Sequence, residues 1–262
     1  ISFLCGLLFV RRQTTIPHTT DCDTCLLTDS RNETFAMATV GGKVQCFYDV
    51  VSPWAYLGFE VITRYARQYP GLVQLELCPF FLGGVMQATG NKPPITVPAK
   101  GAYMFSDLQR SSGYFGVPLT APANFPINTI LAQRLLTVTK QSKPDHLEDL
   151  SRTLWKNLWG GAGGDITRPE DLLKCCVQVG ISADEAKGLL ESTQEQAVKD
   201  ALKDVTEDAV KRGAFGAPTF FVRANGADAE EVMYFGSDRF HLLLPQLGVP
   251  WNGPHPFGLS RL

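Results

Sequence analysis

The residue of this chain with the best surroundings for chemistry is Ser52, within the segment Phe47–Gly58, whose sequence is FYDVVSPWAYLG. A short apolar run ends just before Ser52, and Pro53 and a helical pattern follow it. The serine is therefore predicted to lie at a helix N-terminus, where unpaired backbone N–H groups and the helix dipole stabilise an anion such as a thiolate. For a serine in such a place, capping a helix is the commoner role. The assignment of a chemical role to Ser52 therefore depends on other parts of the sequence.

The elements that position Ser52 form a β-α-β unit. Residues 44–48 are a short β-rich run and are predicted to be a buried strand. Residues 57–69 have apolar side chains at helical spacing, and Pro70-Gly71 ends that helix. Residues 73–81 alternate apolar and polar side chains, which predicts a second strand that is a parallel neighbour of the first.

The middle of the chain is predicted to be irregular and then helical. Many prolines between residues 79 and 126 favour ordered loop, with one short helix at Tyr103–Ser112. Residues 128–211 are helical, and three segments that begin at Thr167, Ser182 and Thr193 have the pattern of capping boxes. An apolar stripe consists of Trp155, Leu158 and Trp159, which we interpret as core side chains.

Sheet signals return near the end of the chain. Pro218–Val222 and Val232–Phe235 are predicted to be a hairpin, followed by a closing helix at Ser237–Leu247 with Ser237 as its N-cap. The predicted fold class is α/β, a thioredoxin-like domain interrupted by an all-helical insertion. The domain comprises residues 43–90 and 212–250, the insertion 91–211, and the C-terminal tail 251–262.

Composition excludes several other classes of protein. Of 262 residues, 44% are hydrophobic and 19% charged, and the formal net charge is −2, so neither nucleic acid nor a membrane span is expected. The seven cysteines are scattered, which favours free thiols in a reducing compartment. Cys22 and Cys25 form a CxxC without a second ligand pair, so we predict no metal site.

Residues 1–42 are predicted to be a disordered or non-native extension. An apolar start at Ile1–Val10 precedes Arg11-Arg12, which reverses the charge order of a secretory signal. Acidic residues such as Asp21 and Glu33 are unlike a mitochondrial presequence, and Met37 would be a natural start before the first strand.

The turn Ser52-Pro53-Trp54-Ala55 occupies the place where DsbA-type oxidoreductases of the thioredoxin superfamily have Cys-x-x-Cys. Without cysteines, this turn cannot exchange disulfides, so the sulfur has to come from another molecule, for which glutathione is the expected donor. From about Lys43 onward the chain resembles the kappa-class glutathione transferases. The likeness lies in five segments: Phe47–Glu60, Gly90–Pro94, Lys100–Leu108, Gly213–Pro218 and Phe235–Arg239.

The resemblance implies eight glutathione-binding positions, which are Ser52, Pro53, Trp54, Asn91, Ala217, Pro218, Ser237 and Asp238. It implies that Ser52 hydrogen-bonds the sulfur and that the backbone of Ala217, ahead of a cis Pro218, binds the cysteinyl part. Ser237 and Asp238 would hold the γ-glutamyl end, which a helix N-terminus and a carboxylate suit physically. Ala217 is smaller than the aliphatic residue expected before this proline.

The implied activity is that of a homodimeric detoxification enzyme, with glutathione as co-substrate and no metal. It would activate the glutathione thiolate for conjugation to electrophiles or for reduction of hydroperoxides. One alternative is a glutathione-dependent isomerase of the 2-hydroxychromene-2-carboxylate type, which residues 97–100 and 116–119 resemble almost as closely. Residues 236–239 and 251–256 favour the transferase. A second alternative is a non-catalytic glutathione-binding or chaperone-like scaffold.

The last three residues, Ser260-Arg261-Leu262, resemble the Ser-Lys-Leu peroxisomal address. We therefore expect the peroxisome as the location of the protein, with the mitochondrion or the cytoplasm as alternatives.

Overall fold

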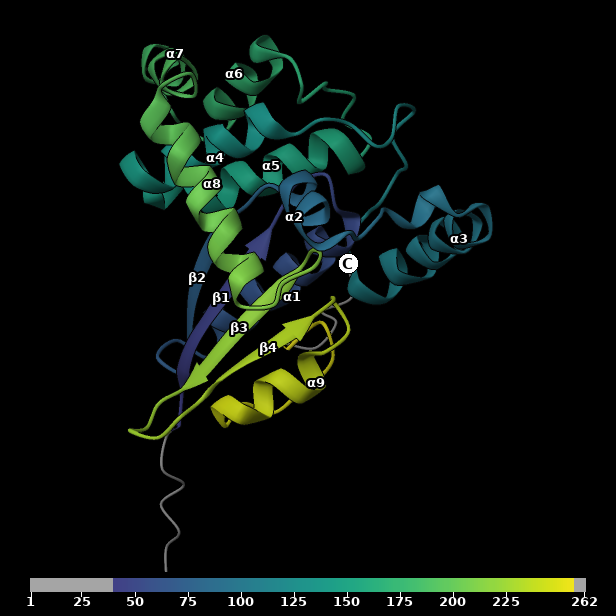
Figure 1. Ribbon diagram of the computed structural model, residues 1–262, viewed down its shortest axis with the longest axis vertical. Helices are drawn as coiled ribbons and strands as arrows, with labels where there is room; N and C mark the ends of the chain where they lie inside the picture. Colours follow the sequence, from purple (N-terminus) through teal and green to yellow (C-terminus); the bar gives the residue numbers. More distant parts are fainter. Residues whose placement is uncertain (1–39, 257–262) are drawn as a thin grey trace, which may run out of the picture. The chain divides into compact units, whose positions relative to one another are not determined.

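The computed structural model describes residues 40–256 (Figure 1). Its centre is a four-stranded sheet in the order β2-β1-β3-β4. The strands are β1 (Gly42–Tyr48), β2 (Val73–Pro79), β3 (Thr219–Ala224) and β4 (Glu231–Phe235). β1 is parallel to β2 and antiparallel to β3, and β3 is antiparallel to β4. The predicted parallel pair and C-terminal hairpin are therefore confirmed.

Helices surround this sheet. α1 (Pro53–Gln68) connects β1 to β2, and a short α9 (Phe240–Leu243) follows β4. Between β2 and β3 come α2 (Leu82–Thr89), α3 (Pro98–Phe115), α4 (Ile130–Ser142), α5 (Leu147–Trp159), α6 (Pro169–Gln178), α7 (Ala183–Ser192) and α8 (Gln196–Lys211). Three 3₁₀ turns lie at Pro94–Thr96, Pro144–His146 and Leu244–Leu247. Figure 1 shows α4 to α7 gathered beyond the carboxyl end of β1, so the predicted fold class, a thioredoxin-like domain with a helical insertion, is confirmed.

Several expectations fall on residues that the structure does not describe. They are the extension at residues 1–39, the Cys22–Cys25 pair and the terminal Ser260-Arg261-Leu262. The domain boundaries drawn at residues 90 and 211 also stay predictions. No helix within residues 40–256 is both long enough and apolar enough to cross a lipid bilayer.

The proline-rich segment is more helical than predicted. α3 runs over 18 residues from Pro98 to Phe115, well beyond the predicted Tyr103–Ser112. Pro98 is compatible with it because a proline at the first helical position gives up an N–H that has no intrahelical partner anyway. α2 was not predicted at all, since it contains Gly83 and Gly84 and its N-cap residue, Phe81, makes no side-chain cap.

The closing helix is shorter than predicted. It begins at Phe240 and ends at Leu243, a 3₁₀ turn replaces the predicted helix from Leu244 to Leu247, and residues 237–239 lie in the turn before it. Pro245 has no N–H and its ring clashes with the carbonyl one turn earlier, which ends the α-helical ladder. The N-cap residue is Arg239, so the prediction that Ser237 caps a helix is wrong.

Only one of the three predicted capping boxes forms. At α7, the Ser182 hydroxyl accepts the N–H of Glu185 and the Glu185 carboxylate accepts the N–H of Ser182. Thr167 instead donates its hydroxyl to Asp165, at 2.6 Å, and α6 begins after Arg168. The hydroxyl of the fully buried Thr193 donates to a backbone carbonyl of the preceding helix.

Alternate residues of β1 face two hydrophobic cores. Val44, Cys46 and Tyr48 belong to the larger core, which includes side chains of α1, α4 and α5. Phe47 belongs to a smaller core on the other face, with Phe80 and Phe221. This alternation is the period-two pattern of a strand, which is buried on both faces at its carboxyl end, and it fixes the direction in which the chain leaves β1 toward Ser52.

Ser182→Ala and Thr167→Ala should lower the free energy of unfolding by different amounts. Ser182→Ala removes a cap that the structure contains and should lower the free energy of unfolding by about 1 kcal/mol. Thr167→Ala removes only an exposed hydrogen bond and should cost less than about 0.5 kcal/mol. Urea unfolding followed by circular dichroism measures both, and equal losses would contradict the assignment.

Candidate functional site

Ser52 is the N-cap of α1, and its hydroxyl makes two hydrogen bonds. It accepts the backbone N–H of Ala55 at 3.1 Å and donates to the backbone carbonyl of Ala217 at 3.4 Å. Pro53 is the first helical residue, and no acidic side chain lies in the first turn of α1. The positive end of the helix dipole is therefore not offset by a carboxylate of α1, and a hydroxyl hydrogen with only a long bond lies beside it.

Ser52 lies on the wall of a pocket of about 820 Å³. Five of the eight predicted binding residues line this pocket, namely Ser52, Pro53, Trp54, Asn91 and Ala217. Pro218, Ser237 and Asp238 do not line it. The pocket is bounded by segments from distant parts of the sequence, which are the start of α1, the start and end of α2, α3, the loop before α4 and the loop before β3.

Asn91 and the loop before β3 are joined by a hydrogen bond. The side-chain amide of Asn91 donates to the Phe215 carbonyl at 2.7 Å, and its oxygen accepts the N–H of Lys92. The peptide bond between Ala217 and Pro218 is cis, as predicted. Together with the Ser52–Ala217 contact, these bonds bring three predicted residues, separated by up to 165 positions, to one pocket.

Ser237 and Asp238 lie in a turn beside the cis proline. The Gly236 N–H donates to the Pro218 carbonyl at 3.0 Å, which holds the turn against the loop before β3. Ser237 is 5% exposed, whereas Asp238 is exposed and forms an ion pair with Arg239. Because Ser237 does not begin a helix, the helix-dipole argument for an anion here fails, and these two assignments depend on the resemblance alone.

Asp49 is a site residue that the sequence reasoning missed. It is fully buried, and its carboxylate accepts the N–H of Val51 at 3.0 Å, the N–H of Leu82 at 2.9 Å and the hydroxyl of Thr129 at 2.7 Å. These donors lie at the Ser52 turn, the start of α2 and the start of α4, all of which line the pocket. Burial raises the pKa of Asp49 to about 6, and the three hydrogen bonds oppose that rise. The signal for Asp49 in the sequence was an acidic residue inside the otherwise apolar run of residues 47–51.

The cysteines of the described part of the chain do not supply a thiolate. Cys46, Cys78, Cys175 and Cys176 are all buried. Burial raises the pKa of Cys46 well above its usual value, that of Cys175 to about 11 and those of Cys78 and Cys176 to about 12. Among residues 40–256, therefore, no cysteine offers a thiolate to the Ser52 pocket, which favours a bound molecule as its source. Within residues 40–256, no group of three or more His, Cys, Asp or Glu side chains could hold a metal ion.

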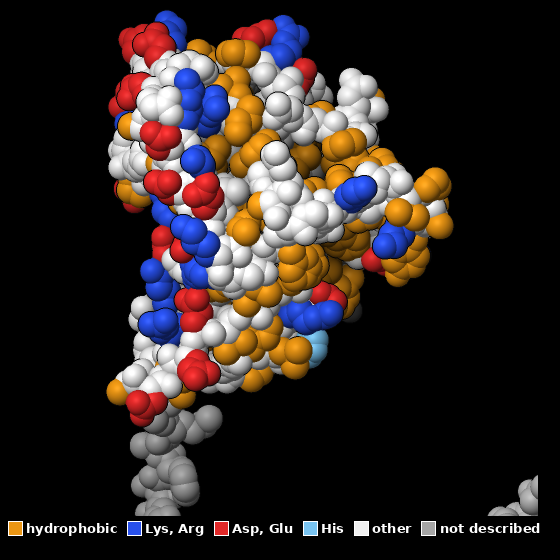
Figure 2. Space-filling model, in the orientation of Figure 1, with side chains coloured by type: hydrophobic (Ala, Val, Ile, Leu, Met, Phe, Trp, Pro, Cys, Tyr) orange, Lys and Arg blue, Asp and Glu red, His pale blue; other side chains and the backbone are white. Residues whose placement is uncertain are grey.

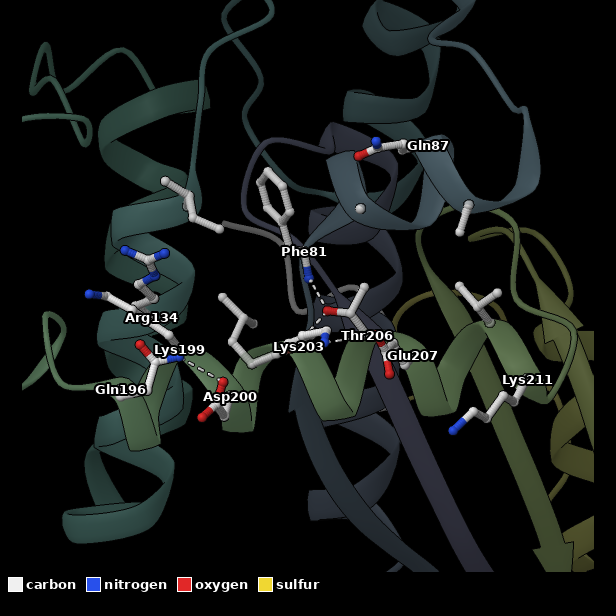
Figure 3. A pocket seen from close by; sticks show the side chains of 15 residues that line it. Phe81, Gln87, Arg134, Gln196, Lys199, Asp200, Lys203, Thr206, Glu207 and Lys211 are labelled. Carbon is white, nitrogen blue, oxygen red and sulfur yellow. Dashed lines mark hydrogen bonds and ion pairs between the residues drawn. The ribbon is translucent and has the colours of Figure 1, made fainter.

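A second pocket, of about 810 Å³, lies between α2, α4 and α8 (Figure 3). Figure 3 shows charged and polar side chains of α8 along one wall and Phe81 opposite them. Its acidic and basic groups are partly paired, as in the Gln196–Asp200 hydrogen bond and the Lys203–Glu207 ion pair. Figure 2 shows charges of both signs along α8, while hydrophobic side chains gather over α3. None of the predicted site residues lines this second pocket, so we take the Ser52 pocket as the candidate site.

The raised pKa of Asp49 predicts a specific pH dependence of stability. The folded pKa of about 6 exceeds the ordinary value of 3.8, so the stabilising contribution of Asp49 is complete below about pH 4 and is lost as the pH rises through 6. Asp49→Asn does not titrate. The free energy of unfolding of wild type minus that of Asp49→Asn should therefore fall by about 2 to 3 kcal/mol between pH 4 and 7.

Urea unfolding at several pH values measures this difference. Asp228→Asn, in the exposed loop between β3 and β4, is the matched control and should follow wild type at every pH. Parallel pH profiles for wild type and Asp49→Asn would contradict the assignment of a raised pKa.

Comparisons with known proteins show the family of this chain. The sequence pattern of the DSBA-like thioredoxin domain matches residues 43–248. The chain is 39% identical to glutathione S-transferase kappa 1 of Homo sapiens over 84% of its own length and 97% of that protein. It is 28% identical to 2-hydroxychromene-2-carboxylate isomerase of Sphingobium xenophagum over 76% of its length and 95% of the isomerase.

Among solved structures, a 2-hydroxychromene-2-carboxylate isomerase superposes with a TM-score of 0.65 at 23% identity and covers 79% of this chain and 94% of the isomerase. At that identity, the likeness supports the fold alone. The family assignment comes from the sequence matches, since a relative at 39% identity is covered almost completely. The chain belongs to the DSBA-like thioredoxin family and, within it, to the kappa glutathione S-transferases.

Proposed function

We propose that this protein is a glutathione transferase in which Ser52 stabilises the thiolate of bound glutathione. The observation that carries the proposal is the position of Ser52, whose hydroxyl lies at the N-terminus of α1 on the wall of a large pocket. Burial raises the pKa of the thiols of the described residues, which favours an external sulfur. Family membership supports glutathione as its source.

The proposed chemistry needs one change of partner at Ser52. The hydroxyl keeps accepting the N–H of Ala55, which fixes its oxygen, while its hydrogen turns from the Ala217 carbonyl to the glutathione sulfur. This exchange costs little because the bond to Ala217 is long, at 3.4 Å. A free thiol has a pKa of about 8.5, and a hydroxyl donor plus a helix N-terminus would lower it by about one to two units.

The pocket offers partners for the remainder of the tripeptide. The backbone of Ala217 lies beside Ser52 and would hydrogen-bond the cysteinyl unit of glutathione. The side chain of Asn91 would contact the glutathione backbone. Lys92 and Lys100 are exposed, line the pocket and suit a carboxylate. Asp238 does not line the pocket but lies in the turn beside Pro218, where it would take the free ammonium of the γ-glutamyl end in exchange for its ion pair with Arg239.

The apolar part of the pocket defines the second substrate. Trp54, Met86, Met104, Phe125 and Ile127 line it and suit an apolar electrophile or an organic hydroperoxide. In conjugation, the thiolate sulfur forms a bond to the electrophilic carbon and the leaving group departs with its electron pair. With a hydroperoxide, the thiolate sulfur takes the terminal oxygen and becomes a sulfenic acid as the O–O bond breaks, and the departing alkoxide gains a proton from solvent to leave as the alcohol. The thiol of a second glutathione then attacks the sulfenic acid, which gives the disulfide and water.

The isomerase remains a second candidate because the chain is 28% identical to an isomerase of the 2-hydroxychromene-2-carboxylate type over nearly all of that enzyme. The same thiolate would add to a conjugated double bond, allow rotation and then leave. Assaying one preparation for both reactions separates the two activities. A scaffold without chemistry would show neither activity. The homodimer expected from the resemblance stays a proposal, which sedimentation velocity tests.

The role of Ser52 predicts the effect of Ser52→Ala. Loss of the hydroxyl donor should lower kcat/KM for glutathione with a chlorodinitrobenzene electrophile by about two- to tenfold at neutral pH, because the hydroxyl supplies part of the lowering of the thiol pKa and the N-terminus of α1 remains. The loss should shrink as the pH rises above the pKa of the bound thiol. Binding of glutathione, measured by calorimetry, should weaken much less.

Ser106→Ala is the matched control, since Ser106 is an exposed serine whose hydroxyl donates only to a backbone carbonyl of its own helix. It should leave kcat/KM unchanged. A Ser52→Ala enzyme with the kcat/KM of wild type at neutral pH would refute the proposed role.

A further inference from the structure

Two tryptophans of α5 bind the backbone of the Ser52 turn. Trp155 and Trp159 lie one helical turn apart on the same face of α5, and both are fully buried. The indole N–H of Trp155 donates to the Ser52 carbonyl at 3.2 Å, and that of Trp159 donates to the Val51 carbonyl at 3.2 Å. The helical insertion thus places two donors on two consecutive carbonyls at the candidate site.

These bonds fix the orientation of the peptide unit between Val51 and Ser52. Its carbonyl is held by Trp159, and its N–H donates to the backbone carbonyl of Asp49 at 3.0 Å. A peptide unit that is bonded at both ends cannot rotate about its axis without losing both bonds. The direction in which the Ser52 side chain leaves the backbone is therefore set in part by an indole from another part of the chain.

The peptide unit between Ser52 and Pro53 has one hydrogen-bonding group fewer than the unit before it. Pro53 has no N–H, so the Ser52 carbonyl is the only hydrogen-bonding group of that unit. It accepts the N–H of Tyr56, within the first turn of α1, and the indole N–H of Trp155. Within the described residues, the Val51 carbonyl accepts a hydrogen bond from Trp159 alone.

We propose that Trp155 and Trp159 are positioning residues for thiolate activation, acting through the Ser52 turn. They hold the hydroxyl of Ser52 toward the pocket. They also bind the partial negative charges of the Val51 and Ser52 carbonyls, which would otherwise oppose a thiolate beside α1. This inference rests on the proposed function of Ser52 and extends it to the helical insertion, which thereby contributes to the chemistry.

The substitution that isolates the N–H groups is tryptophan to phenylalanine. Phenylalanine keeps an apolar ring at each position but cannot donate a hydrogen bond. Trp155 stacks on Tyr56 with ring centroids 5.1 Å apart, and Trp159 packs edge-on against Phe125 at 5.1 Å. Trp159 is the last residue of α5, so Trp159→Phe leaves the Trp155 stack in place and serves as the milder variant.

Trp159→Phe, Trp155→Phe and the double variant are titrated with glutathione bound, and the thiolate is followed by its ultraviolet absorbance. Each single substitution should raise the pKa of the bound thiol by about 0.5 to 1 unit, which means about two- to eightfold less thiolate at neutral pH. kcat/KM should fall by the same factor at neutral pH and approach the wild-type value at high pH, while KM for glutathione changes less than about twofold.

Tyr48→Phe is the matched control. Its buried hydroxyl bonds to Ser151 at 2.6 Å and its ring packs against Trp155, but it makes no bond to residues 51–53. It should lower stability, as measured by urea unfolding, without moving the pKa of the bound thiol. Equal pKa shifts in Tyr48→Phe and the tryptophan variants would show a merely structural role and overturn the inference.

These experiments distinguish a failure of this inference from a failure of the proposed function. If Ser52→Ala raises the pKa of the bound thiol and neither Trp155→Phe nor Trp159→Phe does, the inference is wrong and the proposed function stands. If Ser52→Ala leaves that pKa unchanged, the proposed function fails and the inference fails with it.

Discussion

The whole site depends on the hydrogen bond between the Ala55 N–H and the Ser52 hydroxyl oxygen. That bond fixes the oxygen at the N-terminus of α1 and leaves one hydrogen to donate. In the structure this hydrogen lies toward the Ala217 carbonyl, at a distance long enough for a stronger acceptor to replace it. In the proposed function, this cap becomes a donor for an anion in the pocket, with the positive end of α1 behind it.

The same turn joins the two parts of the fold. β1 ends at Tyr48, and the residues that follow it are bonded to segments of the helical insertion. Trp155 and Trp159 donate from α5, and Asp49 accepts hydrogen bonds from the start of α4 and also from the start of α2, which precedes the insertion. The insertion thus closes one side of the pocket and also fixes the backbone from which Ser52 projects. A buried carboxylate and two buried indoles at one turn are costly unless their polar atoms are bonded, and here all of them are.

The parts of the fold that local sequence patterns determine were predicted from the sequence. The β-rich run of β1, the period-two alternation of β2, the helical spacing of α1 and the hairpin of β3 and β4 predicted the fold, and the Ser-Pro-aromatic turn marked the start of α1. The role of Asp49 was not predictable in this way, because its hydrogen-bond donors lie 33 and 80 residues away at Leu82 and Thr129. Ser237 was misplaced because Ser-Asp after a glycine has the pattern of a helix start, while Pro245 shortens that helix from its other end. The indoles were correctly assigned to the core, but a hydrophobic pattern does not reveal which carbonyl a buried N–H will meet.

The most direct test of the account is the pKa of the thiol of glutathione bound to the wild-type protein, measured by ultraviolet titration of the thiolate. If the turn at Ser52 stabilises the anion, the pKa of the bound thiol lies about one to two units below that of the thiol free in solution. A bound thiol that titrates at the same pH as free glutathione would contradict the claim that the turn at Ser52 stabilises the anion.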